Sequence, residues 1–215
     1  LYISFLQIES RKMISFIQKN NKLNEVKNSL VITYPRTVNI IYGNYPYPHV
    51  VHNFILDIKN NLDPEMYSYT NVKGGMTKFD HYNNNDNFKG FLAYLINNHQ
   101  TTHPDIFKYF LERKGIESAW GNEIKKGEKV NYHYHHCVHG ILYLSKGCDL
   151  ILPELNLKIT PEPGDYYIFP PEILHGCDES KEEASRYCLV FNIAQIPNSY
   201  KYDEKEKILN ERKKS

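Results

Sequence analysis

The sequence has almost no net charge and no long apolar run. Its 26 lysines and arginines balance 25 aspartates and glutamates, so the formal charge is +1 at pH 7. A chain without a basic excess has no long-range field to draw it to nucleic acid or to an acidic membrane. No stretch approaches the roughly 18 apolar residues of a spanning helix, and Gln7 and Glu9 interrupt the apolar start. We therefore expect no nucleic-acid partner, no membrane partner and no signal peptide.

Cysteine is also scarce, and no Cys-x-x-Cys pair occurs. The four cysteines, Cys137, Cys148, Cys177 and Cys188, all lie in the C-terminal half. The absence of paired spacing argues against a zinc ribbon and against a thioredoxin-like redox motif. Free thiols in a reducing cytoplasm are the expected state.

The length is sufficient for one well-filled core. With 215 residues, of which 41% are hydrophobic, a single domain with additions is the natural expectation. We expect residues 1–29 to form an N-terminal extension, 30–195 a single domain, and 196–215 a charged tail. Within the domain, 30–114 should be mainly helical support and 115–195 a β-rich core.

The first half of the domain carries apolar residues at helical spacing. We expect one helix from Val51 to Leu62, a second around Phe88 to Ile96, and a third from Pro104 that Lys114-Gly115 closes. Short strands are predicted at 30–34 and 38–42, a weak helix at 10–26, and a loop or short strand at 70–80. The amphipathic helices need a sheet to cover.

The second half reads as short strands separated by turns. Turn residues recur at 126–127, 146–147, 153–154, 161–164 and 177–181. Spacings of about 8–12 residues are typical of a sandwich or barrel rather than of alternating strands and helices. The expected fold class is therefore α+β: a double-stranded β-helix, or jelly roll, with helices from the N-terminal half packed on it.

Histidines concentrate in one short stretch of this barrel. Four of the chain's ten lie between residues 133 and 139: His133, His135, His136 and His139. If the stretch is one extended strand, alternation places His133, His135, Cys137 and His139 on one face and His136 on the other. A barrel can fold His175 back onto them. Neutral imidazoles suit iron, copper, nickel or zinc, so the cluster predicts a metal site.

Two alternatives remain open from the residues alone. His139 is either a fourth ligand or a hydrogen-bonding group of the pocket. Cys137 and Cys177 each follow a proposed ligand by two residues, so a mixed histidine and cysteine zinc site is conceivable. We expect Trp120 to pack and Asp165 to serve its Pro-Gly-Asp turn.

Two sets of motifs resemble known families. One set follows the two cupin signatures: Gly127, His133-x-His135, Gly147, Gly164, Pro170 and His175. His139 or Gly140 stands where the first signature has glutamate. Trp120-Gly-Asn122, Asn131-x-His133-x-His135, Pro163-Gly-Asp165, Phe169-Pro-x-x-Leu-x-His175 and Arg186-Tyr-Cys-Leu-Val-Phe-Asn192 resemble the 2-oxoglutarate/iron(II) oxygenases common in phage and marine bacterial genomes. The second resemblance covers roughly residues 30–195. Both families share the jelly-roll fold.

The oxygenase resemblance implies a function and a set of roles. It implies iron(II) bound by His133, His135 and His175, with 2-oxoglutarate as cosubstrate and Arg186 at its distal carboxylate. Tyr143 either reaches a bound carboxylate or fills the barrel as an aromatic. His135 stands where that family has an acidic ligand, which also resembles three-histidine thiol-dioxygenase cupins. The alternative role for Arg186 is a rim arginine paired with Glu182 or Glu183.

The leading functional hypothesis is an oxygen-dependent hydroxylase of unknown substrate, with residues beyond the ligands and the cosubstrate contacts unassigned. The first alternative is a three-histidine cupin dioxygenase that does not use 2-oxoglutarate, and the second is a non-catalytic binding barrel, zinc-stabilised or metal-free. Zinc, nickel or copper is the alternative to iron at the site. A homodimer is compatible with the sequence.

Overall fold

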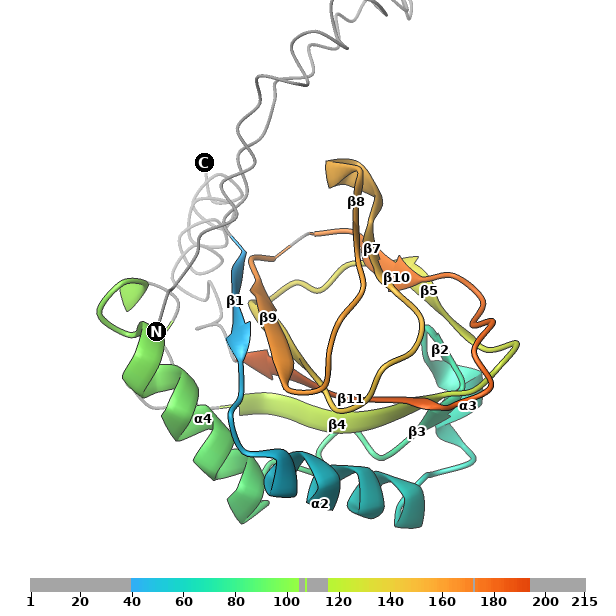
Figure 1. Ribbon diagram of the computed structural model, residues 1–215, viewed down its shortest axis with the longest axis horizontal. Helices are drawn as coiled ribbons and strands as arrows, with labels where there is room; N and C mark the ends of the chain where they lie inside the picture. Colours follow the sequence, from blue (N-terminus) through green and yellow to red (C-terminus); the bar gives the residue numbers. More distant parts are fainter. Residues whose placement is uncertain (1–39, 105–106, 108–115, 172, 194–215) are drawn as a thin grey trace, which may run out of the picture.

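The computed structural model describes residues 40–104, 107, 116–171 and 173–193, and its core is two antiparallel sheets that face each other (Figure 1). One sheet has six strands in the order β1-β9-β6-β11-β4-β3, and the other has five in the order β2-β5-β10-β7-β8. The strands are β1 (Ile41–Asn44), β2 (Val72–Lys73), β3 (Gly75–Met76), β4 (Ile116–Ile124), β5 (Lys129–His133), β6 (His139–Tyr143), β7 (Leu150–Leu152), β8 (Leu157–Ile159), β9 (Asp165–Phe169), β10 (His175–Cys177) and β11 (Arg186–Ile193). This confirms the predicted jelly roll.

The six-stranded sheet is organised around β11, which lies between β4 and β6. Its register with β4 runs from Arg186 opposite Ile124 to Asn192 opposite Ser118. Side chains alternate along β11, so Leu189 and Phe191 pack on the outer face while Cys188 and Val190 pack between the sheets. The alternation predicted for this strand is confirmed.

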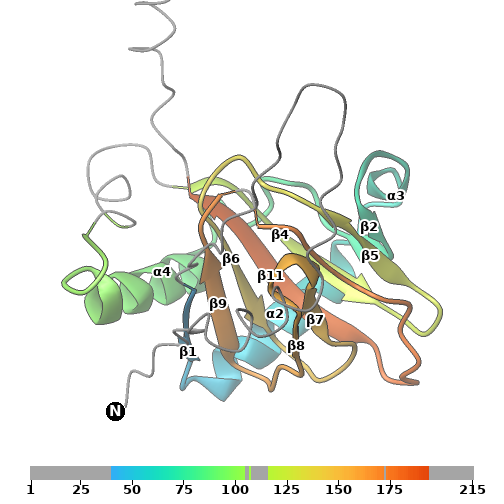
Figure 2. The same ribbon diagram turned by 90° about the horizontal axis from the view of Figure 1, so that it is seen from above.

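Two helices cover the outer face of the six-stranded sheet (Figures 1 and 2). They are α2 (Pro48–Asn60) and α4 (Asp86–His99), and a short helix, α3 (Met66–Tyr69), lies near β3. Both long helices were predicted from their apolar stripes, with bounds that differ by a few residues. Within the described part of the chain, no helix is long and apolar enough to cross a membrane.

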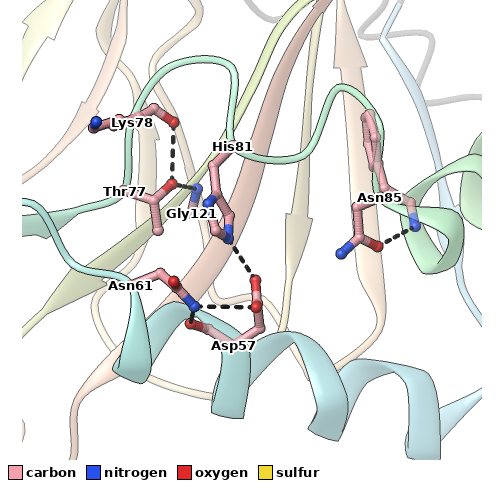
Figure 3. A network of polar contacts seen from close by, with 8 residues as sticks. Asp57, Asn61, Thr77, Lys78, His81, Asn85 and Gly121 are labelled. Atoms are coloured by element: carbon pink, nitrogen blue, oxygen red, sulfur yellow. Dashed lines mark hydrogen bonds and ion pairs between the residues drawn. The ribbon is translucent and has the colours of Figure 1, made fainter.

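Polar contacts fix the segment that connects β3 to α4 against α2 and β4 (Figure 3). His81 Nε2 lies 2.7 Å from Asp57 Oδ2, and Asn61 donates to the same aspartate. Thr77 Oγ1 accepts from the backbone N–H of Gly121 at 3.0 Å. Asn85 caps α4 by accepting from the Phe88 N–H, which satisfies one of the free donors at the helix start.

The first half of the domain is less purely helical than predicted. Its three short strands extend the sheets: β1 pairs with β9, β2 with β5, and β3 with β4. The expected strand at 38–42 corresponds to β1, shifted by a few residues. The predicted elements at 10–26 and 30–34 lie outside the described residues, as does most of the helix predicted from Pro104.

The expectation of one continuous strand through the histidine cluster is wrong. Strand β5 ends at His133, the chain turns over residues 134–138, and β6 begins at His139 in the opposite sheet. A strict alternation therefore does not extend from His133 to His139. The two ends of this segment approach one site from two sheets.

Candidate metal centre

Three histidines meet at one end of the space between the sheets. His133 ends β5, and His175 begins β10 as its direct partner in the pairing register. His135 follows two residues after β5. One ring nitrogen from each lies within 4.8 Å of the others, and the Nε2 atoms of His133 and His135 are 3.1 Å apart. The fold thus brings together the three imidazoles that the sequence singled out.

The Nδ1 hydrogen bonds of these rings leave the Nε2 atom of each ring available to bind a metal. His133 Nδ1 lies 2.8 Å from the Asn131 carbonyl oxygen, and His175 Nδ1 lies 2.9 Å from the Ile173 carbonyl oxygen. A carbonyl only accepts, so each Nδ1 carries the proton. His135 Nδ1 also faces an oxygen, the side-chain Oδ1 of Asn192 at 2.8 Å. Each Nε2 then presents a lone pair.

Burial keeps the three imidazoles neutral at pH 7. Burial is the first cause in each case, and it lowers the pKa of His133, lowers the pKa of His135 to about 4 and lowers the pKa of His175 to about 3. The neighbouring imidazoles lower the pKa of His135 and His175 further, because a positive charge on one disfavours protonation of the next. Neutral imidazole is the form that binds metals.

The donor set fits a divalent transition metal. Two nitrogens bound at right angles, each about 2.0–2.1 Å from one metal, stand about 2.9 Å apart. The 3.1 Å between the Nε2 atoms of His133 and His135 is close to that value. Without a shared ion or proton, two lone pairs would face each other at this distance. Imidazole donors suit iron, nickel, copper or zinc.

His139 lies against this group but is not part of it. Its ring stacks on those of His135 and His175, with centroids 4.2 and 4.6 Å away, and on Phe169 at 5.0 Å. The side chain is fully buried, and neither ring nitrogen has a hydrogen-bond partner among the described residues. Burial lowers the pKa of His139 well below the ordinary value. The observed arrangement is a neutral ring stacked against His135 and His175.

A cavity that the triad lines extends between the two sheets and is partly open to solvent. Apolar side chains form most of its wall, and the histidines line it together with Trp120, Asn122, Tyr143 and Arg186. No aspartate or glutamate lines it in the part of the chain that the structure describes.

Arg186 is buried in this cavity, not exposed at a rim. Only 3% of the side chain is exposed, and its guanidinium donates to the Cys148 carbonyl oxygen at 3.2 Å and lies 5.6 Å from the Tyr143 ring centroid. Its Nε has no partner among the described residues. The rim alternative is wrong, because Glu183 pairs with Lys126 instead. Among the described residues no carboxylate lines the cavity with this cation, whose neighbours are the thiols of Cys177 and Cys188 and the Tyr143 phenol. A buried cation is costly unless an anionic group neutralises it.

Tyr143 is the aromatic neighbour of this arginine. Its side chain is buried in the cavity wall, and burial raises the pKa of Tyr143 well above its ordinary value. It therefore keeps its phenolic proton and can donate to an anion beside Arg186.

Sequence reasoning missed two polar groups of the cavity. Trp120, expected only to pack, also lines the cavity, and its ring stacks on His135 with centroids 6.2 Å apart. Neither its Nε1 nor Asn122 Oδ1 has a partner in the described region. Both belong to the Trp120-Gly-Asn122 motif. Because Ala119 faces outward, alternation along the strand places Trp120 and Asn122 inward, and this pattern could have identified them.

The cysteines stay outside the metal group. In the described ranges, the histidine triad is the group of suitable residues whose ligand atoms converge, and it contains no cysteine. Cys177 Sγ accepts from the Val130 N–H at 3.3 Å, and burial raises the pKa of Cys137 to about 11. The mixed zinc site is therefore not formed.

Asp165 accepts from the Glu162 N–H and from Asn44, which is the turn role expected for it.

A second cavity lies on the other side of His135. It is partly open to solvent and is lined by Glu117, Tyr134, His135, His136, Cys137 and Asn192. His136, predicted to face away from the metal, is exposed here. His135 thus lines both an inner, mainly apolar cavity and an outer cavity whose lining is polar and apolar in similar measure.

The fold is shared with solved prolyl hydroxylases. No family model matches the sequence, and no curated protein matches it either. The viral collagen prolyl hydroxylase of Paramecium bursaria Chlorella virus-1, in its 2-oxoglutarate complex, superposes with a TM-score of 0.53 at 14% identity, covering 71% of this chain and 94% of that one. A Pseudomonas putida prolyl-4-hydroxylase gives 0.51 at 13% identity, covering 72% and 92%. At this identity the similarity establishes the double-stranded β-helix fold.

Proposed function

We propose that this protein is an iron(II)- and 2-oxoglutarate-dependent oxygenase that hydroxylates a substrate of unknown identity. His133, His135 and His175 hold the metal, and Arg186 with Tyr143 holds the distal carboxylate of the cosubstrate. We further propose a cytoplasmic enzyme whose partners are small molecules. The fold shared with prolyl hydroxylases supports this function, and so does the chemistry of the inner cavity.

The observation that carries the proposal is the pairing of two features in one cavity. The imidazole triad offers three neutral nitrogen ligands, and the same cavity contains a buried guanidinium that shares it with no carboxylate from the described residues. A ligand that chelates a metal at one end and presents a carboxylate at the other satisfies both. Guanidinium suits this role because its planar donors bind a carboxylate in bidentate geometry.

The two features lie near each other along β10. The guanidinium lies close to the Cys177 sulfur, and Cys177 is two residues beyond His175 on this short strand. A short dicarboxylate, whose two anionic ends are only a few carbon atoms apart, suits this arrangement.

The chain's own residues supply binding and orientation. The backbone carbonyls of Asn131 and Ile173 hold two ligand rings in the metal-binding tautomer, and the apolar wall excludes water from the bound cosubstrate. When bound, iron(II) would supply the oxygen chemistry, which protein side chains alone do not provide.

Succinate release tests the proposed reaction. Purified protein supplied with iron(II), ascorbate and 2-oxoglutarate should form succinate, even without a prime substrate. The triple requirement for metal, oxygen and 2-oxoglutarate distinguishes turnover from contamination, and His175→Ala serves as the matched inactive control. Absence of succinate from metal-loaded protein that is confirmed to be folded contradicts the proposal.

One observation favours a second candidate function. His135 stands where the resembling oxygenases carry an acidic ligand, so the donor set is one negative charge short of the usual facial triad. A three-histidine dioxygenase that oxidises a bound anion directly would use the same cavity, with Arg186 on the substrate carboxylate. Oxygen consumption with small thiol carboxylates, without 2-oxoglutarate, would favour this candidate.

A further inference from the structure

The three imidazoles of the triad are held in two different ways. His133 and His175 each donate Nδ1–H to a carbonyl oxygen two residues earlier, those of Asn131 and Ile173, at 2.8 and 2.9 Å. These acceptors belong to the backbone, so any side chain at positions 131 and 173 leaves them in place. The orientation of these two ligands follows from the path of the chain itself.

His135 instead relies on a side chain from another strand. It lies beyond the end of β5, and its Nδ1 is 2.8 Å from Oδ1 of Asn192 on β11. The Nδ2 of that amide donates to Ser118 Oγ on β4 at 3.0 Å, and Asn192 and Ser118 are direct partners in the strand register. In this arrangement the serine accepts from the amide nitrogen, and the amide oxygen faces the imidazole.

We propose that Asn192 is the positioning residue that makes His135 a metal ligand, with Ser118 holding the amide in the required orientation. The inference rests on the proposed metal site. An acceptor at Nδ1 selects the tautomer whose Nε2 lone pair is free. If the amide were reversed, its N–H would face Nδ1 and the ring proton would move to Nε2, which removes the ligand atom.

The role also explains how an imidazole replaces the acidic ligand of the resembling oxygenases. A carboxylate needs no tautomer selection, whereas an imidazole at this position binds metal in only one of its two neutral forms. Asn192 follows Arg186, Cys188 and Val190 in the inward alternation of β11, so the strand that carries the proposed cosubstrate arginine also carries the support for the ligand. Asn192 and His135 both line the outer cavity.

Metal titration of four variants tests this role. We expect Asn192→Leu to weaken the binding of nickel(II) or cobalt(II) by about 10- to 100-fold, the range seen when an outer partner of a ligand is removed. Asn192→Asp keeps an acceptor and should retain binding within a few-fold. Ser118→Ala should cost less than Asn192→Leu, because the amide keeps its oxygen and loses only its fixed orientation. Tyr132→Phe, which removes a hydroxyl bound to Asp178 outside the site, is the control and should bind as the native protein does.

A double variant separates positioning from a general structural effect. In a His135→Ala background, Asn192→Leu should weaken residual metal binding no further, since the ring that it positions is absent. Equal losses in both backgrounds would overturn the proposal, as would full affinity in Asn192→Leu. If His133→Ala and His175→Ala also leave metal binding unchanged, the metal site itself is wrong. That outcome differs from a failure of Asn192 alone.

A second readout does not involve metal. Nitrogen chemical shifts of histidine side chains in the metal-free protein report the tautomer of each ring. We expect His135 to carry its proton on Nδ1 in the native protein and to shift toward the Nε2–H form in Asn192→Leu, while His175 stays unchanged. A native His135 that already carries its proton on Nε2 would contradict the proposal.

Discussion

The two faces of the six-stranded sheet are built from the same strands and serve different ends. On the outer face, Leu189 and Phe191 are fully buried against the aromatic and aliphatic side chains of α2 and α4. On the inner face, Arg186 and Cys188 of the same strand line the cavity beside the triad. The outer face holds the fold mainly through apolar burial, whereas the inner face lines the cavity that contains the histidine triad and Arg186. A strand can therefore be altered on one face with effects that are absent on the other.

The largest effect is expected for Leu189→Ala, on the outer face. Leu189 is fully buried, so the truncation should lower the free energy of unfolding by about 2–5 kcal/mol. Urea denaturation measures this loss. Metal affinity at a temperature where the variant is folded should remain native. A loss of metal affinity in the folded variant would show that the two faces are not independent.

Arg186→Met, three residues before Leu189 and on the inner face, should weaken cosubstrate binding without lowering stability. Losing the buried anchor should weaken 2-oxoglutarate binding by roughly 30- to 1,000-fold, equivalent to about 2–4 kcal/mol. The free energy of unfolding should stay level or rise, because the unpaired charge is removed from an apolar cavity. Calorimetric titration and urea denaturation together check both statements.

Arg186→Lys is the matched control for that change. It keeps the charge but loses the planar donors, so its affinity should lie between those of the native protein and the methionine variant. An unchanged cosubstrate affinity in Arg186→Met would remove the arginine from the site.

Acidification should destabilise the metal-free protein, with contributions from both faces. The pKa of His175 is lowered to about 3 and that of His135 to about 4 by burial, and burial lowers the pKa of His99 beneath α4 as well. Above about pH 6.5 these groups are neutral in both states and contribute no dependence. As the pH falls below 6.5, the unfolded chain binds protons first, so stability is lost until the folded pKa values are reached.

Thermal unfolding at pH 7 and pH 5 measures this loss. His175→Leu and His99→Leu should each make the pH dependence shallower, the first from the space between the two sheets and the second from beneath α4. A metal-free protein equally stable at both pH values would contradict the neutral, buried state of these rings.

The smallest effect is expected for His139→Phe. The substitution keeps an aromatic ring in the stack on His135 and removes two buried nitrogens without partners in the described region. Stability should change by no more than about 1–2 kcal/mol, because the gain from removing unsatisfied groups opposes the slightly larger ring. Metal content should remain native. Loss of metal from this variant would make His139 a ligand.

The fold was largely predictable because it follows from local patterns. The apolar stripes at Val51 and Phe88 define helices that need a sheet, and the regular turn spacing of the second half predicts a barrel. His133 and His175 were predictable as partners because their motifs have family-like spacing. The alternation along β11 correctly placed Arg186 inside.

The rest depended on contacts that no local pattern contains. Alternation assumed an extended chain through Tyr134, but a turn there sends His139 to the opposite sheet. The bond between Asn192 and His135 joins residues 57 positions apart, and its support by Ser118 depends on the register of β4 with β11. Such pairings follow from the assembled sheet and not from the spacing of the residues along the chain.

The most direct test of the central claim is a calorimetric titration of 2-oxoglutarate into the protein, without oxygen, before and after loading with iron(II). We predict one binding site per chain that requires metal, with His175→Ala showing no binding and Arg186→Met showing binding weakened by roughly 30- to 1,000-fold. Binding that is equally strong without metal, or no binding to the metal-loaded native protein, would contradict a cavity built to chelate a dicarboxylate between the histidine triad and Arg186.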